Sequence, residues 1–183
     1  MAEGRFRGRV PRILGVDPGT VRTGWGVVEK GPRGLSCVAG GAIELRGSRS
    51  ERLGRICREL VDIARRYRPT AVSLEKAFAA ANLQAALRLG EARGAVLAAA
   101  ALAGLEVFEY SPAEIKLAVV GYGRAEKQQV QAMTRHLLAL PCPPGPDEAD
   151  ALASAICHLH VADVRERVGG SFSVARKGGG RRA

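Results

Sequence analysis

The chain has 183 residues, of which 46% are hydrophobic, and this size and composition predict a single well-cored domain. Its formal net charge of +10 and sequence pI of about 10.2 favour a polyanionic partner, with nucleic acid as the first candidate. The four cysteines form no C-x-x-C pair and no zinc-like spacing with histidine, which argues against a zinc site and predicts reduced thiols.

The two ends of the chain are basic and lack hydrophobic periodicity. We expect a flexible basic arm over residues 1–12 and a disordered basic tail over residues 164–183, which leaves residues 13–163 as the folded domain. The N-terminus carries no secretory apolar segment, and the longest apolar run, Ala95 to Leu105, is too short to cross a bilayer. A soluble, cytoplasmic protein with no membrane partner is expected.

The folded part opens with three predicted antiparallel strands in a meander. Apolar runs bounded by glycine and proline place these strands at residues 13–16, 25–29 and 35–45. Gly40 and Gly41 indicate a bulge in the third strand.

Helical and extended patterns then alternate. Ser48 and Glu51 have capping-box spacing and open an amphipathic helix that Pro69 ends. Further strands are predicted at residues 70–74 and 105–110, and further helices at 82–103, 112–119, from 125 and from 147. This order predicts an α/β fold with a five-stranded mixed sheet, three antiparallel strands followed by parallel strands, flanked by helices.

Two acids follow buried strands directly. Asp17 comes after the first strand and before Pro18-Gly19, and Glu75 closes the strand at residues 70–74. Each acid fits either an ordinary turn or strand end or a functional site, because ligands of such sheets bind beyond the strand ends. If the two strands are neighbours, the acids share one site.

The last predicted helix brings two more acids. Asp147 and Asp150 are three residues apart and therefore lie on one helical face. They serve either as caps of the helix or as members of the same site. Four carboxylates in one cleft would repel one another unless divalent cations lie among them. Oxygen ligands favour Mg²⁺ or Mn²⁺, and two such ions about 4 Å apart support phosphodiester hydrolysis.

The long predicted helix carries Gly90 and Gly94 on one face, which Ala86 and Leu97 extend. Small residues at this spacing let another element approach closely. That element is either a second copy of the chain across a dimer interface or another part of the same chain.

Five motifs in this order resemble the RuvC Holliday junction resolvase family over about residues 12–160. They are Gly-Val-Asp17-Pro-Gly-Thr, Ser-Leu-Glu75-Lys-Ala-Phe78, Leu-Gly90-Glu-Ala-Arg-Gly94, Val-Val-Gly-Tyr-Gly-Arg-Ala-Glu-Lys127 and Asp147-Glu-Ala-Asp150-Ala-Leu. The resemblance implies a ribonuclease H-like fold and a homodimer with two magnesium-dependent sites, in which Mn²⁺ can substitute. It also implies symmetric nicking of four-way DNA junctions, with 5′-phosphate and 3′-hydroxyl ends, beside branch-migration proteins of the RuvA and RuvB type.

The resemblance also implies roles for single residues. The metal-binding acids of the family match Asp17, Glu75, Asp147 and Asp150. The DNA-binding residues match Phe78, Asn82, Lys116, Arg124 and Lys127. Among these, Phe78 matches a junction-stacking aromatic, or is an ordinary core residue, and the two lysines match catalytic cations beside the scissile backbone. Ala81 departs from the family pattern, in which a basic residue often precedes the asparagine.

Two other functions fit part of the sequence. The D-x-G-T stretch at Asp17, followed by a hairpin, also resembles the phosphate loop of actin-like nucleotide-binding domains, but this chain has room for one lobe and lacks a second D-x-G loop. A non-catalytic junction-binding protein would explain the charge. The complete acidic set argues against it.

Overall fold

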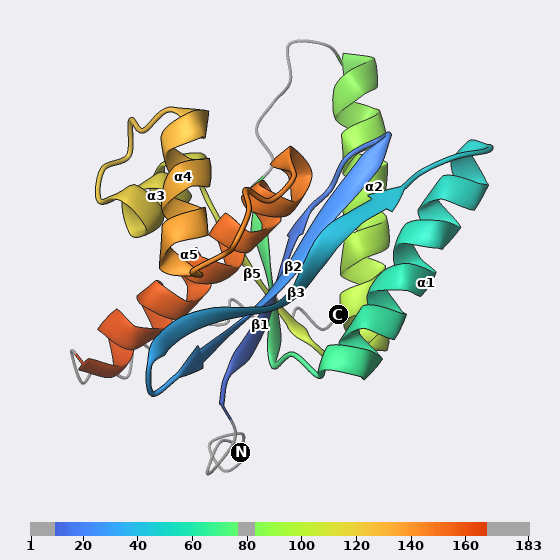
Figure 1. Ribbon diagram of the computed structural model, residues 1–183. Helices are drawn as coiled ribbons and strands as arrows, with labels where there is room; N and C mark the ends of the chain where they lie inside the picture. The colour runs from blue at the N-terminus through green and yellow to red at the C-terminus, as the bar shows by residue number, and fades with distance from the viewer. Residues whose placement is uncertain (1–9, 77–82, 168–183) are drawn as a thin grey trace, which may run out of the picture.

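A mixed five-stranded sheet forms the centre of the computed structural model, which describes residues 10–76 and 83–167 (Figure 1). The strands are β1 (Arg12–Asp17), β2 (Arg22–Gly31), β3 (Gly34–Glu44), β4 (Ala71–Glu75) and β5 (Glu106–Tyr110). Their order is β3-β2-β1-β4-β5. The β2 strand is antiparallel to both neighbours, whereas β4 is parallel to β1 and β5. The predicted mixed sheet is confirmed.

Helices cover both faces of the sheet, as Figure 1 shows. One face packs against α1 (Arg49–Tyr67) and α2 (Leu83–Leu102), and the other against α5 (Pro146–Arg167), on which α3 (Pro112–Val120) and α4 (Lys127–Leu137) lie. The strands separate two apolar clusters. In β1, Leu14 and Val16 belong to the cluster beneath α1 and α2, whereas Ile13 belongs to the cluster beneath α5. The regular structure extends past both predicted bounds of the domain, since β1 begins at Arg12 and α5 continues to Arg167.

The third strand does have an irregularity, but at Val38, because Val27 and Val28 pair with Ala39 and Cys37; the predicted position at Gly40 and Gly41 is wrong. Both glycines stay in the regular ladder. A glycine inside a strand marks either a bulge or a close approach of another group. Here the second reason fits Gly40, because a Cβ there would meet the end of the Glu148 side chain on α5, whereas a Cβ on Gly41 would make only an ordinary contact with Trp25.

Helix α5 lies directly on the sheet because the strands beneath it lack side chains at the contact. Gly15 of β1 pairs with Gly26 of β2. A Cβ on Gly15 would overlap the backbone oxygen of Ala151, and a Cβ on Gly24 would overlap the backbone oxygen of Asp147. These glycines therefore set the height of α5 above the strand ends.

Gly15→Ala should destabilise the protein by about 3 kcal/mol, because the new methyl group must push a buried helix away from the sheet. Denaturant unfolding would measure the loss. The matched control is Gly31→Ala, at the end of β2, where a Cβ meets nothing within 4 Å. We expect that variant to stay within about 0.5 kcal/mol of the wild type. Equal midpoints for all three proteins would contradict the close approach of α5.

Gly90 and Gly94 lie on an exposed face of α2. Among the described residues, a Cβ added at either position meets nothing within 4 Å. Leu83, Leu87 and Leu97 are also exposed on this helix. Of the two alternatives for the glycines, the described part of the chain therefore shows no contact within the same chain. Although α2 is rich in apolar residues, neither it nor any other described helix is long and apolar enough to span a membrane.

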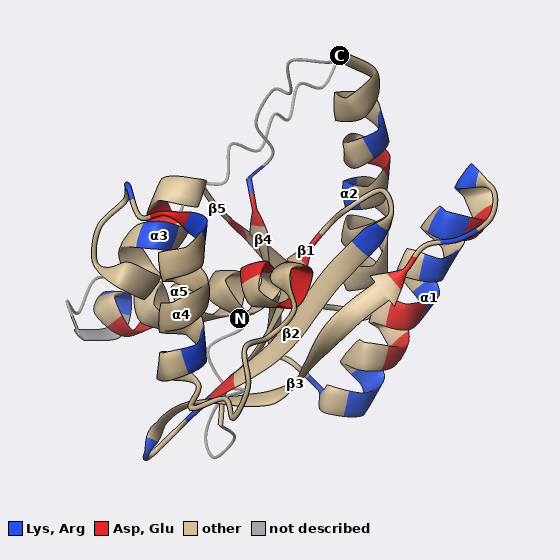
Figure 2. Ribbon diagram, turned by 45° about the horizontal axis from the view of Figure 1, so that its top comes forward, with Lys and Arg blue, Asp and Glu red and all other residues tan. Residues whose placement is uncertain are grey.

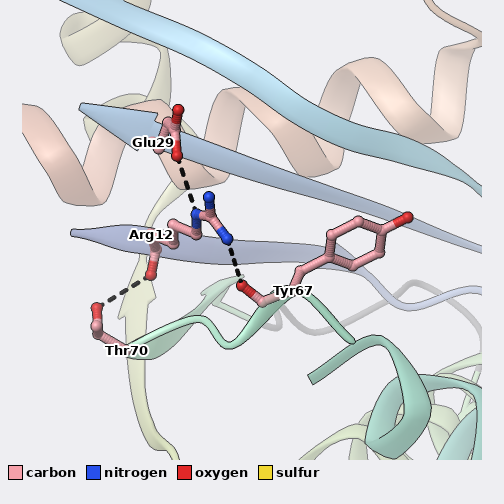
Figure 3. A network of polar contacts seen from close by, with 4 residues as sticks. All are labelled: Arg12, Glu29, Tyr67 and Thr70. Atoms are coloured by element: carbon pink, nitrogen blue, oxygen red, sulfur yellow. Dashed lines mark hydrogen bonds and ion pairs between the residues drawn. The ribbon is translucent and has the colours of Figure 1, made fainter. Parts of the chain in front are cut away.

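Arg12 fastens the end of the sheet at which β1 begins (Figure 3). Its Nε donates to Glu29 Oε2 at 2.9 Å, and its Nη1 donates to the backbone oxygen of Tyr67 at 3.1 Å. Thr70 Oγ1 donates to the backbone oxygen of Arg12 at 3.0 Å. These bonds join the start of β1 to β2, to the end of α1 and to the segment that enters β4. The parallel strands β1 and β4 are thereby held in register.

Candidate active site

Asp17 and Glu75 are the last residues of the neighbouring parallel strands β1 and β4. The register pairs Val16 with Leu74, so the two acids come next at the same edge of the sheet. Val16 and Leu74 are buried in the cluster beneath α1 and α2. Because side chains alternate along a strand, the two acids that follow them face α5.

The first turns of α5 bring two more acids to this edge. Asp147 and Asp150 lie next to the helix start at Pro146. The backbone of Asp147 rests on Gly24, which pairs with Asp17 across the sheet. Figure 2 shows the acidic positions at the start of α5 close to those at the ends of β1 and β4. The structure thus brings all four predicted acids to one site.

The four carboxylates interact strongly. The pKa of Asp17 is raised from 3.8 to about 7, first by burial and then by the nearby carboxylates of Asp150, Glu75 and Asp147, in that order. The pKa of Glu75 is raised by burial and by Asp150. Burial and like charge both disfavour the ionised form of a carboxyl group. Full deprotonation of the cluster therefore destabilises the folded chain.

Two lysines provide positive charge beside the acids. Lys127, the first residue of α4, donates its Nζ to Asp150 Oδ2 at 2.7 Å, and this hydrogen bond is the main reason that the pKa of Lys127 is raised. Lys127 and Lys116 line a cavity of about 370 Å³ together with Glu75 and Asp150. A larger cavity of about 690 Å³ between α1 and α2 is lined by none of the four site acids. The smaller one is therefore the candidate site.

The remaining predicted site residues are less closely placed. Arg124 is exposed in the loop between α3 and α4, and no contact in the structure ties it to the acids. Phe78 and Asn82 lie outside the described residues. The roles assigned to all of these side chains, and to the four acids, stay predictions.

Two contacts at the site were not foreseen from the sequence. Ser73 Oγ donates to the backbone oxygen of Ser154 at 2.8 Å and lies 2.7 Å from its Oγ, which joins β4 to α5. Arg93 of α2 donates to the backbone oxygen of Glu75 at 2.6 Å. The serines are 81 residues apart and leave no local pattern. For Arg93, the one available signal was its place in the Leu-Gly-Glu-Ala-Arg-Gly motif.

His158, which sits in a Cys-His-x-His stretch, is a packing residue. Its Nδ1 lies 2.8 Å from the hydroxyl of Tyr110, and its ring is 4.5 Å from that of Phe108. Burial lowers the pKa of His158 to about 4. The imidazole therefore stays neutral at physiological pH.

This burial predicts a pH-dependent stability. Between pH 6.5 and 4 the unfolded chain binds a proton at His158 that the folded chain does not. The free energy of unfolding should therefore decrease as the pH is lowered from 6.5 to 4, by at most about 3 kcal/mol. Urea unfolding of the wild type and of His158→Gln across pH 4.5–7.5 would measure it. As the pH falls, the free energy of unfolding of the wild type should decrease relative to that of His158→Gln. Parallel curves would contradict the prediction.

The acidic set fits a hard divalent cation in its chemistry, since all four candidate ligands are carboxylates. Within residues 10–76 and 83–167, however, no three acidic, histidine or cysteine side chains converge tightly enough to enclose an ion. Lys127 instead neutralises Asp150. A cation would compete with this lysine and would relieve the repulsion that, together with the larger effect of burial, raises the pKa of Asp17.

The sequence and the fold both match known proteins. A model of the family described as "Crossover junction endodeoxyribonuclease RuvC" matches residues 13–158. The protein of that name from Alkalilimnicola ehrlichii is 48% identical over 160 residues, which cover 87% of this chain and 97% of that protein. The one from Heliobacterium modesticaldum is 52% identical over 151 residues, covering 81% and 93%.

Solved structures agree with these sequence matches. The structure of Thermus thermophilus RuvC in complex with a Holliday junction substrate has a TM-score of 0.80 and 37% identity, and the match covers 84% of this chain and 96% of that one. The yeast mitochondrial Holliday junction resolvase Ydc2, with a TM-score of 0.62 and 11% identity, supports the fold alone. These matches remove the actin-like alternative. The chain has the ribonuclease H-like fold and belongs to the RuvC family of crossover junction endodeoxyribonucleases.

Proposed function

We propose that this protein resolves four-way Holliday junctions in DNA, in recombination and repair, by symmetric nicks that leave 5′-phosphate and 3′-hydroxyl ends. The observation that carries the proposal is the convergence of four carboxylates at one sheet edge of a chain with net charge +10. Membership of the RuvC family supports it, as does the T. thermophilus relative solved with a Holliday junction substrate.

We infer that the acids hold divalent cations, two per site, with Mg²⁺ as the native ion and Mn²⁺ as a substitute. The ligands would be Asp17, Glu75, Asp147 and Asp150. When bound, the ions would supply activation of the attacking water and stabilisation of the leaving 3′ oxygen. The protein contributes rigid placement, because two ligands end paired strands and two lie in a helix that rests on glycines.

The lysines suit the phosphate of the strand to be cut. Lys116 and Lys127 line the cavity that Glu75 and Asp150 also line, so a phosphate held there would lie between cations and acids. Such cations stabilise negative charge as it develops on the phosphate oxygens. Lys127 pairs with Asp150 in the structure, and a DNA phosphate would offer it a second anionic partner. We assign further DNA contacts to Phe78, Asn82 and Arg124, from the family resemblance.

A homodimer follows from the need for two symmetric cuts, and α2 offers a surface for it. Its exposed positions Leu83, Leu87, Gly90, Gly94 and Leu97 recur at intervals of three and four residues, which places them on one helical face. Two such helices can pack closely at the glycines. Family membership further supports contact with RuvA- and RuvB-type branch-migration proteins and a cytoplasmic location. We propose a nuclease domain that extends from Arg12, where β1 begins, to Arg167, where α5 ends.

The test is a product map on synthetic four-way junction, fork and linear duplex DNA with Mg²⁺. We expect paired nicks at symmetry-related positions of the junction, products that a ligase can seal, and little cleavage of the duplex. Binding of the junction without nicking, in Mg²⁺ and in Mn²⁺, would favour the non-catalytic alternative instead.

A further inference from the structure

Arg93 joins helix α2 to the strand end that carries Glu75. Its Nη1 donates to the backbone oxygen of Glu75 at 2.6 Å, and its Nη2 donates to the carboxylate of Glu109 on β5. The Arg93 side chain is only 13% exposed, whereas that of Glu109 is 42% exposed. A guanidinium with so little solvent around it holds its acceptors more firmly than one on an open surface, and its planar fork fixes their relative position.

The backbone oxygen of Glu75 lies at the edge of the sheet where β1 and β4 end. On one side of β4, strand β1 ends at Asp17 and is followed by Pro18, which has no N–H to donate. On the other side, the N–H of Lys76 donates to the backbone oxygen of Tyr110 at 2.7 Å. The peptide group between Glu75 and Lys76 is therefore held at its oxygen by Arg93 and at its nitrogen by β5.

We propose that Arg93 is a positioning residue for Glu75. By fixing the peptide group that follows Glu75, it fixes the point from which this side chain reaches toward Asp17 and Asp150. The role is one of positioning, because the Arg93 guanidinium already donates to Glu75 and Glu109. The inference rests on the proposed function, because it assigns Arg93 a part in a metal-dependent nuclease site.

Single-turnover cleavage of a synthetic four-way junction, at saturating protein and increasing Mg²⁺, would test the proposal. We expect Arg93→Ala to lower the maximal rate by about 10- to 100-fold, because a shift of about 1 Å in a catalytic group has effects of this size. Half-maximal cleavage should need more Mg²⁺. The junction Kd should stay within about twofold of the wild-type value, since the substitution leaves the proposed DNA-binding residues unchanged. Arg93→Lys keeps one cationic donor and should restore part of the rate.

The matched control is Arg49→Ala, which removes the ion pair between Arg49 of α1 and Glu91 of α2, away from Glu75. It should cleave at the wild-type rate. If Arg93→Ala does not fold, Arg93→Gln replaces it, because a glutamine cannot span both acceptors; circular dichroism would establish folding of each variant. Wild-type rate and Mg²⁺ dependence in the folded variant would overturn the proposal, as would an equal loss in Arg49→Ala.

A second readout separates this inference from the proposed function. The rise in melting temperature on adding Mg²⁺ or Mn²⁺ reports cation binding without cleavage. We expect a smaller rise for Arg93→Ala than for the wild type. If the wild type binds cations but does not cut junctions, the proposed function fails while this comparison still tests Arg93. An equal rise in both proteins would overturn the positioning role.

Discussion

Asp17→Asn should abolish junction cleavage, lowering the single-turnover rate by about 10³-fold or more, while the junction Kd changes by less than about threefold. Asp17 is the most central acid of the site, since the charges of Asp150, Glu75 and Asp147 all act on it. An amide of the same shape removes the negative charge that a cation needs. The basic surface that binds DNA phosphates is untouched, so affinity should persist.

Binding and cleavage must be measured on the same junction, by gel shift in Ca²⁺ and by nicking in Mg²⁺. Asp62→Asn is the matched control, because Asp62 is an exposed acid of α1 that pairs only loosely with Arg65, at 3.4 Å. It should cleave normally. Cleavage by Asp17→Asn within tenfold of the wild type would refute the assignment of Asp17 as a ligand.

The acids could be found from the sequence because each one follows a strong local signal. Asp17 comes directly before a Pro-Gly turn, Glu75 closes a buried strand, and Asp147 and Asp150 share one helical face. Their convergence depends on the strand order, which the local patterns left open and which places β1 beside β4. Local patterns thus singled out the four acids, and the topology brought them together.

The contacts that hold the acids in place could not be predicted in this way. Ser73 and Ser154 meet across 81 residues, and Arg93 reaches the carbonyl group of a residue 18 positions away. Such pairs have no sequence period. Glycines were ambiguous for a related reason, since Gly40 fits both a bulge and a helix contact, and only the fold distinguishes these.

Gly90 and Gly94 are a second case in which a glycine pattern fits two structural explanations. Their spacing fits equally well a contact within the chain and one between two chains. A Cβ added to either glycine meets no other atom nearby, so residues 10–76 and 83–167 supply no partner for them. The spacing marks a face that another helix can approach closely, and we propose that a second copy of the chain covers it.

Asp17→Asn should also stabilise the protein in the absence of metal, by about 2–4 kcal/mol at pH 8. The folded-state pKa of Asp17 is raised to about 7 from 3.8, so the folded chain holds this proton more tightly than the unfolded chain does. The resulting stabilisation is complete below about pH 3.8 and is lost as the pH rises to 7. At pH 8 the wild type therefore carries a buried, repelled charge that asparagine does not.

Thermal unfolding in EDTA at pH 8 should show Asp17→Asn melting roughly 5–10 °C above the wild type. The gap should narrow as the pH falls from 7 toward 4, because the wild-type carboxyl then becomes neutral too. Added Mg²⁺ should raise the melting temperature of the wild type but barely that of the variant, because the cation offsets the repulsion among the acids. A variant that melts at or below the wild type in EDTA would show that the acids do not strain the metal-free fold. The opposite result would mean that the site gives up stability in exchange for metal binding, since the charge that destabilises the fold without metal is the one that attracts the cation.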